Sequence, residues 1–384
     1  MQQKNTQRMI YAFGISMATI MALSLILPAI SSNLNNSQPQ PQDTAPTATA
    51  VVNPTPLPIT DFSSIIFEED YLHPSGLYSV EVPTGWVVLS SPSLSTQTQT
   101  TLSNFNAQSE IYVYIEKPSV PITTMEELSA YFSGASLSSS WRAFGGGVEL
   151  LFRDEVDGKL IVDFALDGGD GTEYLAQHTA WFDEDWIYVV RIFVPSNASE
   201  LLFHMRDMMV ESIHTIDRFN DTPVVWQSYY DFGTENIMRF PPTWRVSDGG
   251  LGLPISIESV VESGVRVRME AQEGNVADED AARAWVEDTH DGIEVASVAP
   301  TTHENGGFSV AYNYTDADGN GVSGLVVLFN GMDEQLHIAE LQIPDGGVDL
   351  NSDEARETYG DATMAMDTFS MLSGLNFPQI AGLN

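Results

Sequence analysis

An acidic turn between two tryptophans is the first place where side chains of this sequence could do chemistry. Trp181 and Trp186 enclose Asp183, Glu184 and Asp185. Exposed indole rings stack on sugars and attract cations, and carboxylates beside them could serve glycoside hydrolysis. Alternatively, the two rings pack across the strands at the end of a hairpin. The five residues are therefore the predicted binding site for a neutral or cationic ligand.

A second turn carries oxygen ligands at the spacing of a calcium loop. Asp316, Asp318 and Asn320 occupy positions 1, 3 and 5 of such a loop, and Gly321 occupies position 6. The bidentate Glu expected at position 12 is replaced by Val327. A hairpin turn also favours Asp, Asn and Gly because of its backbone angles. The sequence leaves two alternatives, a hairpin turn or a weak calcium site at Asp316, Asp318 and Asn320, and no other cofactor is expected.

Other patterns of catalysis and metal binding are missing from the sequence. There is no cysteine, which excludes thiol catalysis, thiolate zinc sites and iron–sulfur clusters. The seven histidines form neither HxH nor HExxH. No pair stands out among the 53 acidic residues. The sequence therefore favours a binding or assembly module without catalysis, and a secreted hydrolase acting on cell-wall or glycan material is the alternative.

Both turns belong to a segment that the sequence contains twice. Residues 167–195 and 316–344 have the same length. Each contains an Asp/Gly turn, an apolar run, an acidic turn and a second apolar run that ends at Pro. Two matched hairpins indicate a tandem duplication of one folded unit. We therefore expect a first domain at 61–219 and a second at 220–384.

The elements around these hairpins also occur in matching order. Period-two alternation predicts strands at 111–116 and 265–270. A capping box formed by Thr124 and Glu127 starts a short helix, and Asp278 starts its counterpart. Mostly hairpin-connected strands with a few helices predict an α+β fold with an antiparallel sheet in each unit.

Apolar stripes predict which helix faces are buried. The second short helix should bury Ala281, Ala284 and Trp285. A long amphipathic helix should close each unit, with the stripes Leu202, Met205, Met209, Ile213 and Ile216 in the first unit and Ala355, Tyr359, Ala362, Met366 and Phe369 in the second. Trp86 and Trp244 follow a Pro stop in both copies and are expected in the core.

This order of elements resembles the PsbP-like fold. The resemblance rests on the stop Val82-Pro83-Thr84-Gly85-Trp86, its looser counterpart Phe240-Pro241-Pro242-Thr243-Trp244, the short acidic helices, the hairpins and the closing helices. It covers about 62–218 and about 226–374. It implies two tandem α/β/α sandwiches, each a mainly antiparallel sheet flanked by helices, and a binding or assembly role in secreted or membrane-tethered bacterial proteins. It brings no catalytic residues.

The N-terminal part of the sequence predicts a location outside the cytoplasm. Residues 9–30 contain no charge, and as a helix they would be about 33 Å long, enough to cross a hydrocarbon core of about 30 Å. Lys4 and Arg8 precede them, which keeps the N-terminus in the cytoplasm. Residues 1–31 are expected to be a single-pass signal anchor in the cell membrane; the alternative is a cleaved signal peptide and a secreted protein. Residues 32–60, rich in Pro and Thr, are expected to form a disordered stalk.

The strong negative charge limits the partners. The chain has 15 basic and 53 acidic residues and a net charge of −38. Two of the basic residues, Lys4 and Arg8, precede the apolar stretch, so the part that follows it is even more acidic. Such a surface repels phosphate backbones and anionic headgroups. We therefore expect no nucleic acid as partner. The expected partners are the membrane, through the N-terminal helix, and an unknown protein or a neutral or cationic ligand.

Overall fold

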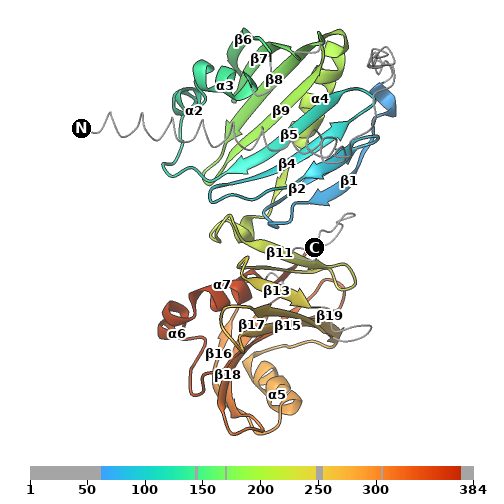
Figure 1. The fold of residues 1–384 in the computed structure, drawn as a ribbon. Helices are drawn as coiled ribbons and strands as arrows, with labels where there is room; N and C mark the ends of the chain where they lie inside the picture. The colour runs from blue at the N-terminus through green and yellow to red at the C-terminus, as the bar shows by residue number, and fades with distance from the viewer. Residues whose placement is uncertain (1–61, 143–145, 169–170, 248–253, 304–305, 373–384) are drawn as a thin grey trace, which may run out of the picture. The chain divides into compact units, whose positions relative to one another are not determined.

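A computed structural model describes residues 62–372 except 143–145, 169–170, 248–253 and 304–305 (Figure 1). The expected signal anchor at 1–31 and stalk at 32–60 lie outside the described residues. Within the described part, no helix combines the length and the apolar character that crossing a membrane requires. The chain forms two compact units. The first contains the described residues of 1–66, 84–90 and 100–211, and the second contains those of 67–83, 91–99 and 212–384.

The first unit is built on a seven-stranded antiparallel sheet with the order β3-β4-β5-β9-β8-β7-β6. The strands are β3 (Val87–Ser90), β4 (Gln97–Asn104), β5 (Ser109–Glu116), β6 (Val148–Val156), β7 (Lys159–Asp167), β8 (Glu173–Phe182) and β9 (Ile187–Pro195). Helices α2 (Met125–Tyr131) and α3 (Gly134–Trp141) pack on one face, and α4 (Ser199–Glu211) packs on the other (Figure 1). The predicted capping box is confirmed, since Thr124 and Glu127 each accept a hydrogen bond from the other's backbone amide.

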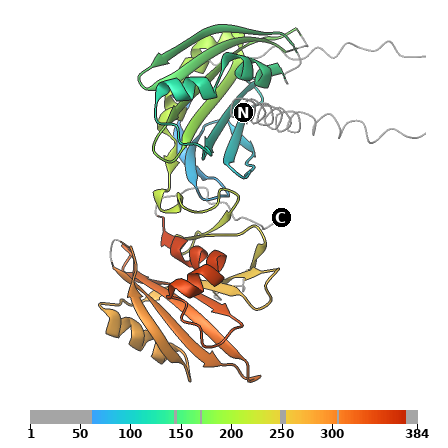
Figure 2. The ribbon, with the colours of Figure 1, turned by 90° about the vertical axis from the view of Figure 1, so that its left-hand side faces the viewer.

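The second unit is built on a sheet with the order β13-β14-β15-β19-β18-β17-β16. The strands are β13 (Trp244–Ser247), β14 (Ile255–Ser259), β15 (Arg266–Glu273), β16 (Glu294–Pro300), β17 (Gly307–Thr315), β18 (Gly321–Asn330) and β19 (Gln335–Ile343). Helix α5 (Glu279–Thr289) packs on one face, and α6 (Asp353–Thr358) and α7 (Gly360–Thr368) pack on the other (Figure 2). Asp278 caps α5 as predicted.

The second unit also contains two small sheets, β1-β2-β10 and β11-β12-β20. Their strands are β1 (Phe67–Leu72), β2 (Tyr78–Pro83), β10 (His214–Thr215), β11 (Gln227–Asp231), β12 (Asn236–Phe240) and β20 (Ser370–Met371). Single turns of 3-10 helix lie at Phe62–Ser64, Ser196–Ala198 and Asp217–Phe219.

The duplication predicted from the sequence is visible in the strand orders. Adding ten to each strand number converts the order of the first large sheet, and of the first small sheet, into that of the second. The strands expected at 111–116 and 265–270 are β5 and β15. The α+β fold class and the presence of two similar antiparallel sheets are thus confirmed. The domain bounds 61–219 and 220–384 stay a prediction.

The closing helices differ from the prediction. Helix α4 ends at Glu211 because the chain then leaves the helix to pair His214 with Ser79 of β2, so Ile213 and Ile216 lie beyond the helix. The second closing helix is interrupted at Tyr359, whose φ of −112° and ψ of 38° are not helical. The residues of the predicted stripes that are buried are Leu202, Met205, Met209, Ala355, Ala362, Met366 and Phe369.

The prediction for the short helix of the second unit is confirmed only in part: Trp285 packs against the core, but the fully buried residues are not the predicted alanines. Ala282 and Val286 are fully buried, whereas Ala284 is exposed. Ala282 and Val286 lie one turn apart on the side of α5 that contacts the core formed with β17 and β18, and the tertiary contact decides which residues are buried. The predicted burial of Trp86 and Trp244 is confirmed, at 5% and 2% exposure.

A buried arginine holds together the loops of the second unit. The Arg239 guanidinium donates to the carbonyl oxygens of Ser75, Pro223 and Trp226, over 2.6, 2.9 and 3.2 Å, and to the hydroxyl of Thr222. Burial lowers the pKa of Arg239 to about 9, so the group stays charged at neutral pH. Carbonyl oxygens of two loops therefore solvate the charge of Arg239, and these hydrogen bonds link the two loops.

We predict that Arg239→Met destabilises the second unit. The substitution keeps most of the side-chain volume but removes the donor to the carbonyl oxygens of Ser75 and Trp226, while Pro223 keeps its bond from the Trp226 amide, at a cost of about 3 kcal/mol or more. Urea unfolding of the full chain measures this loss. The control is Arg245→Met, because Arg245 is exposed and bonds only nearby carbonyl oxygens. Equal stability of the two variants would contradict the role of Arg239.

Candidate functional site

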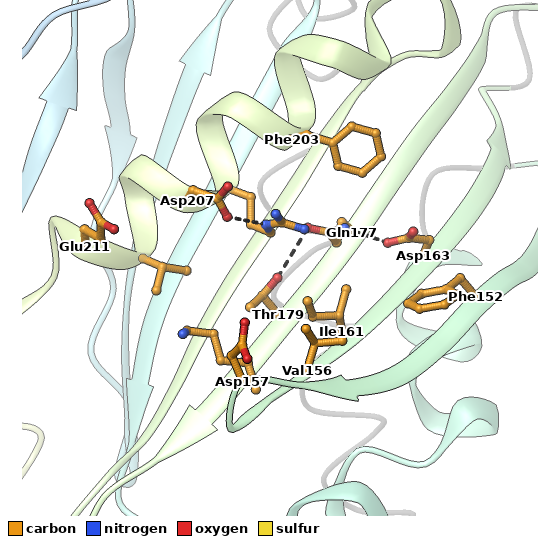
Figure 3. Close-up of a pocket in the computed structure, with 13 residues that line it drawn as sticks. Phe152, Val156, Asp157, Ile161, Asp163, Gln177, Thr179, Phe203, Asp207 and Glu211 are labelled. Atoms are coloured by element: carbon orange, nitrogen blue, oxygen red, sulfur yellow. Dashed lines mark hydrogen bonds and ion pairs between the residues drawn. The ribbon is translucent and has the colours of Figure 1, made fainter.

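A groove of about 510 Å³ lies beside helix α4 in the first unit (Figure 3). Helix α4 forms one wall with Phe203 and Val210, and strand β6 forms the opposite wall with Phe152 and Val156. Phe152 and Phe203 are 42% and 43% exposed, although both are aromatic. Apolar walls that stay open to solvent above a polar floor are typical of a ligand-binding site.

The floor of the groove is a chain of hydrogen-bonded polar side chains. Gln177 of β8 donates from Nε2 to a carboxylate oxygen of Asp163 on β7 over 2.7 Å, and Thr179 donates to the other end of the Gln177 amide over 3.4 Å. Gln177 and Thr179 are almost fully buried. Burial raises the pKa of Asp163, and the hydrogen bond from Gln177 and the charge of Arg206 offset this in part. The floor thus offers a fixed array of oxygen atoms and amides.

The second unit fills the equivalent positions with apolar residues. We call residues that pair with one another across neighbouring strands a row. The row Asp163, Gln177 and Ile192 of the first sheet corresponds to the row Ala311, Leu325 and Leu341 of the second. In the next row on this face, Thr179 corresponds to Val327. Ala311, Leu325 and Val327 are buried in the core under α7. The polar floor therefore belongs to the first copy alone and is not required by the fold.

The opposite face of each sheet buries one charged residue at the same place. In the first unit, Arg191 of β9 lies 3.9 Å from the centre of the Trp141 ring and donates to the Ser140 hydroxyl over 3.0 Å. The corresponding residue of β19 is Glu340, as the pairs Arg191 with His178 and Glu340 with Val326 show. Burial lowers the pKa of Arg191 to about 10.

Glu340 is stabilised as a carboxylate by three donors. Burial pushes its pKa up, but hydrogen bonds from His290, Tyr312 and Gln342 outweigh this effect and hold the pKa at about 2. The hydrogen bond with Glu340 raises the pKa of His290. Helices α3 and α5 thus each supply a partner to the buried charge beneath them, which indicates a structural role for both charges.

A carboxylate is also buried in the first unit. Glu116, at the end of β5, is 2% exposed and accepts a hydrogen bond from the Tyr131 hydroxyl over 2.5 Å. Burial raises the pKa of Glu116 to about 7, although the bond from Tyr131 lowers it in part. Glu116 therefore changes its charge near neutral pH without contact to the groove.

The predicted site around the two tryptophans forms the end of the β8–β9 hairpin. Trp186 is buried, and Trp181 stacks on Tyr188 with ring centres 5.3 Å apart. Asp183 accepts hydrogen bonds from the backbone amides of Asp185 and Trp186. The two indoles are therefore not an exposed pair, and this corrects the expectation that both could stack on one ligand. A ligand-binding role of the exposed Asp183, Glu184 and Asp185 stays a prediction.

The predicted calcium loop folds as a hairpin turn. Asp316 accepts hydrogen bonds from the backbone amides of Asp318 and Asn320 and from the Asn320 side chain. These bonds lower the pKa of Asp316. In the parts of the chain that the structure describes, no group of three or more His, Asp or Glu residues is arranged to hold a metal ion. A calcium site at Asp316, Asp318 and Asn320 stays a prediction.

The groove was not among the sites predicted from the sequence. The signal that could have found it is polar residues within apolar strands: Asp163 alone interrupts the apolar segment 160–166, and Gln177 begins the polar run Gln177-His178-Thr179 within 174–182. Such residues are expensive in a buried strand unless a partner or a ligand meets them. Phe152 and Phe203 carry no such signal, because only the tertiary structure places them at the surface.

Parts of the chain are similar to solved structures of other proteins. Neither a protein-family model nor a curated protein matches the chain. The solution structure of cyanobacterial PsbP (CyanoP) from Synechocystis sp. PCC 6803 is similar, with 13% identity, coverage of 38% of this chain and 92% of that chain, and a TM-score of 0.30. The Ran-binding protein Mog1p of Saccharomyces cerevisiae is similar with 16% identity, coverage of 40% and 97%, and a TM-score of 0.30. A protein of Bacteroides thetaiotaomicron has 14% identity, coverage of 38% and 48%, and a TM-score of 0.26.

We predict that Glu116 makes the first unit less stable as the pH rises. Its folded pKa of about 7 lies above the ordinary value of 4.5, so the favourable contribution is complete below pH 4.5 and is lost as the pH rises through 7. The change is on the order of 3 kcal/mol. Melting of the full chain at acidic and at mildly alkaline pH measures it. Glu116→Gln should abolish this part of the pH dependence, and Glu126→Gln, on the exposed side of α2, should retain it. The same pH dependence in both variants would rule the assignment out.

Proposed function

We propose that the protein is a binding module without catalysis and that the groove beside α4 is its ligand-binding site. The observation that carries this proposal is the difference between the two copies. The same row holds Asp163 and Gln177 in the first copy and Ala311 and Leu325 in the second. The floor residues bond to one another, yet the fold can hold apolar residues in their place, so we attribute the polar floor of the first copy to a ligand.

The walls of the groove support the same proposal. Phe152, Val156 and Phe203 are each at least 40% exposed and surround the polar floor. Burying the apolar surface of these side chains against a ligand contributes about 25 cal/mol per Å² to the free energy of binding. The floor would then fix the orientation of the ligand through directional hydrogen bonds.

The location of the module is part of the proposal. The uncharged stretch 9–30 and the Pro-rich segment 32–60 support a single-pass protein of the cell membrane whose two units stand outside the cytoplasm. The net charge of −38 favours a neutral or cationic ligand over nucleic acid.

A variant that copies the second unit tests the groove. The triple substitution Asp163→Ala, Gln177→Leu and Thr179→Val gives the floor the residues that the second copy carries at these positions, so the fold should tolerate it. A photo-cross-linking phenylalanine at position 203 of the full chain, in intact cells, should form an adduct with the ligand. The triple substitution should reduce the adduct by about tenfold or more.

A cross-linker at Phe232 is the control, because this side chain is 68% exposed but belongs to the second unit. It should give no corresponding adduct. The proposal fails if position 203 forms no adduct, or if the adduct persists in the triple variant.

A further inference from the structure

Strand β6 is an exposed edge of the first large sheet. It is the last strand in the order, and no strand in the described ranges pairs with its outer side. Its nine residues are mostly exposed, and Leu150, Leu151 and Phe152 are 44%, 52% and 42% exposed. A long edge strand with apolar side chains is a template for pairing with another chain.

In the second large sheet, the equivalent edge strand is protected against pairing, whereas β6 of the first large sheet is not. Glu155 of β6 pairs with Leu160, and the row continues to Ala180. The corresponding row of the second sheet is Pro300, Phe308 and Leu328, so Pro300 of the edge strand β16 stands where β6 has Glu155. Proline has no backbone N–H and prevents pairing at an edge. The first copy keeps the N–H group at this position.

The amide of Glu155 points away from its neighbour strand. It donates to a carboxylate oxygen of Asp154 over 2.8 Å. In an antiparallel hairpin, every second residue of an edge strand directs its N–H and C=O outward, where an added strand would bond to them. The side chain of Asp154 covers this donor in the free protein and can turn away when a strand pairs there.

Strand β6 is also one wall of the groove. Phe152 and Val156 line the groove from β6, opposite Phe203 of α4 (Figure 3). Side chains alternate between the two faces of a strand, so every second side chain of a strand added to β6 would lie on the groove side of the sheet. Main-chain pairing and apolar contacts in the groove are thus available to one extended segment.

The charge of the groove favours a basic occupant. Four carboxylates line it, from Asp157, Asp163, Asp207 and Glu211, against the two cationic side chains of Lys159 and Arg206. Arg206 is already bonded to Asp207 over 2.6 Å. The rest of this chain is too acidic to provide a basic segment or a matching second copy, given its net charge of −38.

We infer that the groove binds an extended segment of another protein whose groove-facing side chains, at every second position, include both apolar and basic ones. The main chain of the segment pairs with the outer edge of β6, its groove-facing apolar side chains contact Phe152 and Phe203, and its groove-facing basic side chains meet the carboxylates that line the groove. This inference rests on the proposed function and adds the class of ligand to it.

Synthetic peptides test the class of ligand. The probe is a fluorescent peptide of nine residues, Val-Thr-Lys-Thr-Val-Thr-Lys-Thr-Val, equal in length to β6, so that Val and Lys share one face of the strand; its counterpart has Glu in place of Lys. Fluorescence anisotropy with the full-length protein at low salt should show binding of the Lys peptide, about tenfold or more weaker binding of the Glu peptide, and loss of affinity at high salt.

Substitutions at position 155 test the pairing with β6. Glu155→Pro introduces the residue that the second copy has in this row and should weaken binding of the Lys peptide by about tenfold or more. Glu155→Ala keeps the N–H group and should change binding by less than about threefold. The melting temperature of both variants shows that the first unit is folded.

Any of three results would overturn the inference: the Lys peptide does not bind; the two substitutions at position 155 weaken its binding equally; or the free protein is a dimer that Glu155→Pro dissociates. If the peptide fails while the cross-link from position 203 still depends on the groove floor, the proposed function stands and the ligand is of another class. If both fail, the proposed function fails as well.

Discussion

Both units depend on central strands that have no face in contact with water. Every residue of β9 is buried, and all residues of β19 after Gln335 are buried as well. A polar side chain on such a strand must find its partner inside the protein. Arg191 finds Trp141 and Ser140 from α3, and Glu340 finds His290 next to α5. The helices that cover the sheet are therefore positioned by these charges as well as by apolar contacts.

The two copies keep the same strand order but differ at the groove floor and at the edge strand. The central rows must stay buried, so they tolerate exchange of Arg191 for Glu340 only with new partners on the covering helix. The groove floor and the edge strand are less constrained. There the first copy has Asp163, Gln177 and Glu155, where the second has Ala311, Leu325 and Pro300. The second copy has apolar residues in the floor and a proline in the edge strand, whereas the first copy leaves a polar floor and an unpaired edge.

Local patterns predicted the elements whose causes are local. The capping box at Thr124, the N-cap at Asp278, and strands β5 and β15 follow from residues within one or two turns of each other. The closing helices were predicted too long, because pairing of His214 with Ser79 competes with helix α4 and Ser79 lies far away in the sequence. The stripe of α5 was misplaced because the core beneath the helix selects Ala282 and Val286.

By itself, the sequence determined the duplication, the α+β class and the acidic character, since these follow from repeated patterns and from composition. Only the tertiary structure decided that Phe152 and Phe203 face each other across a groove, that Gln177 lies in its floor, and that β6 is an edge. Trp181 and Trp186 illustrate the difference, because their spacing is local but the burial of Trp186 depends on the neighbouring strands. Exposure is a property of the packed chain, and residues far apart in the sequence fix it together.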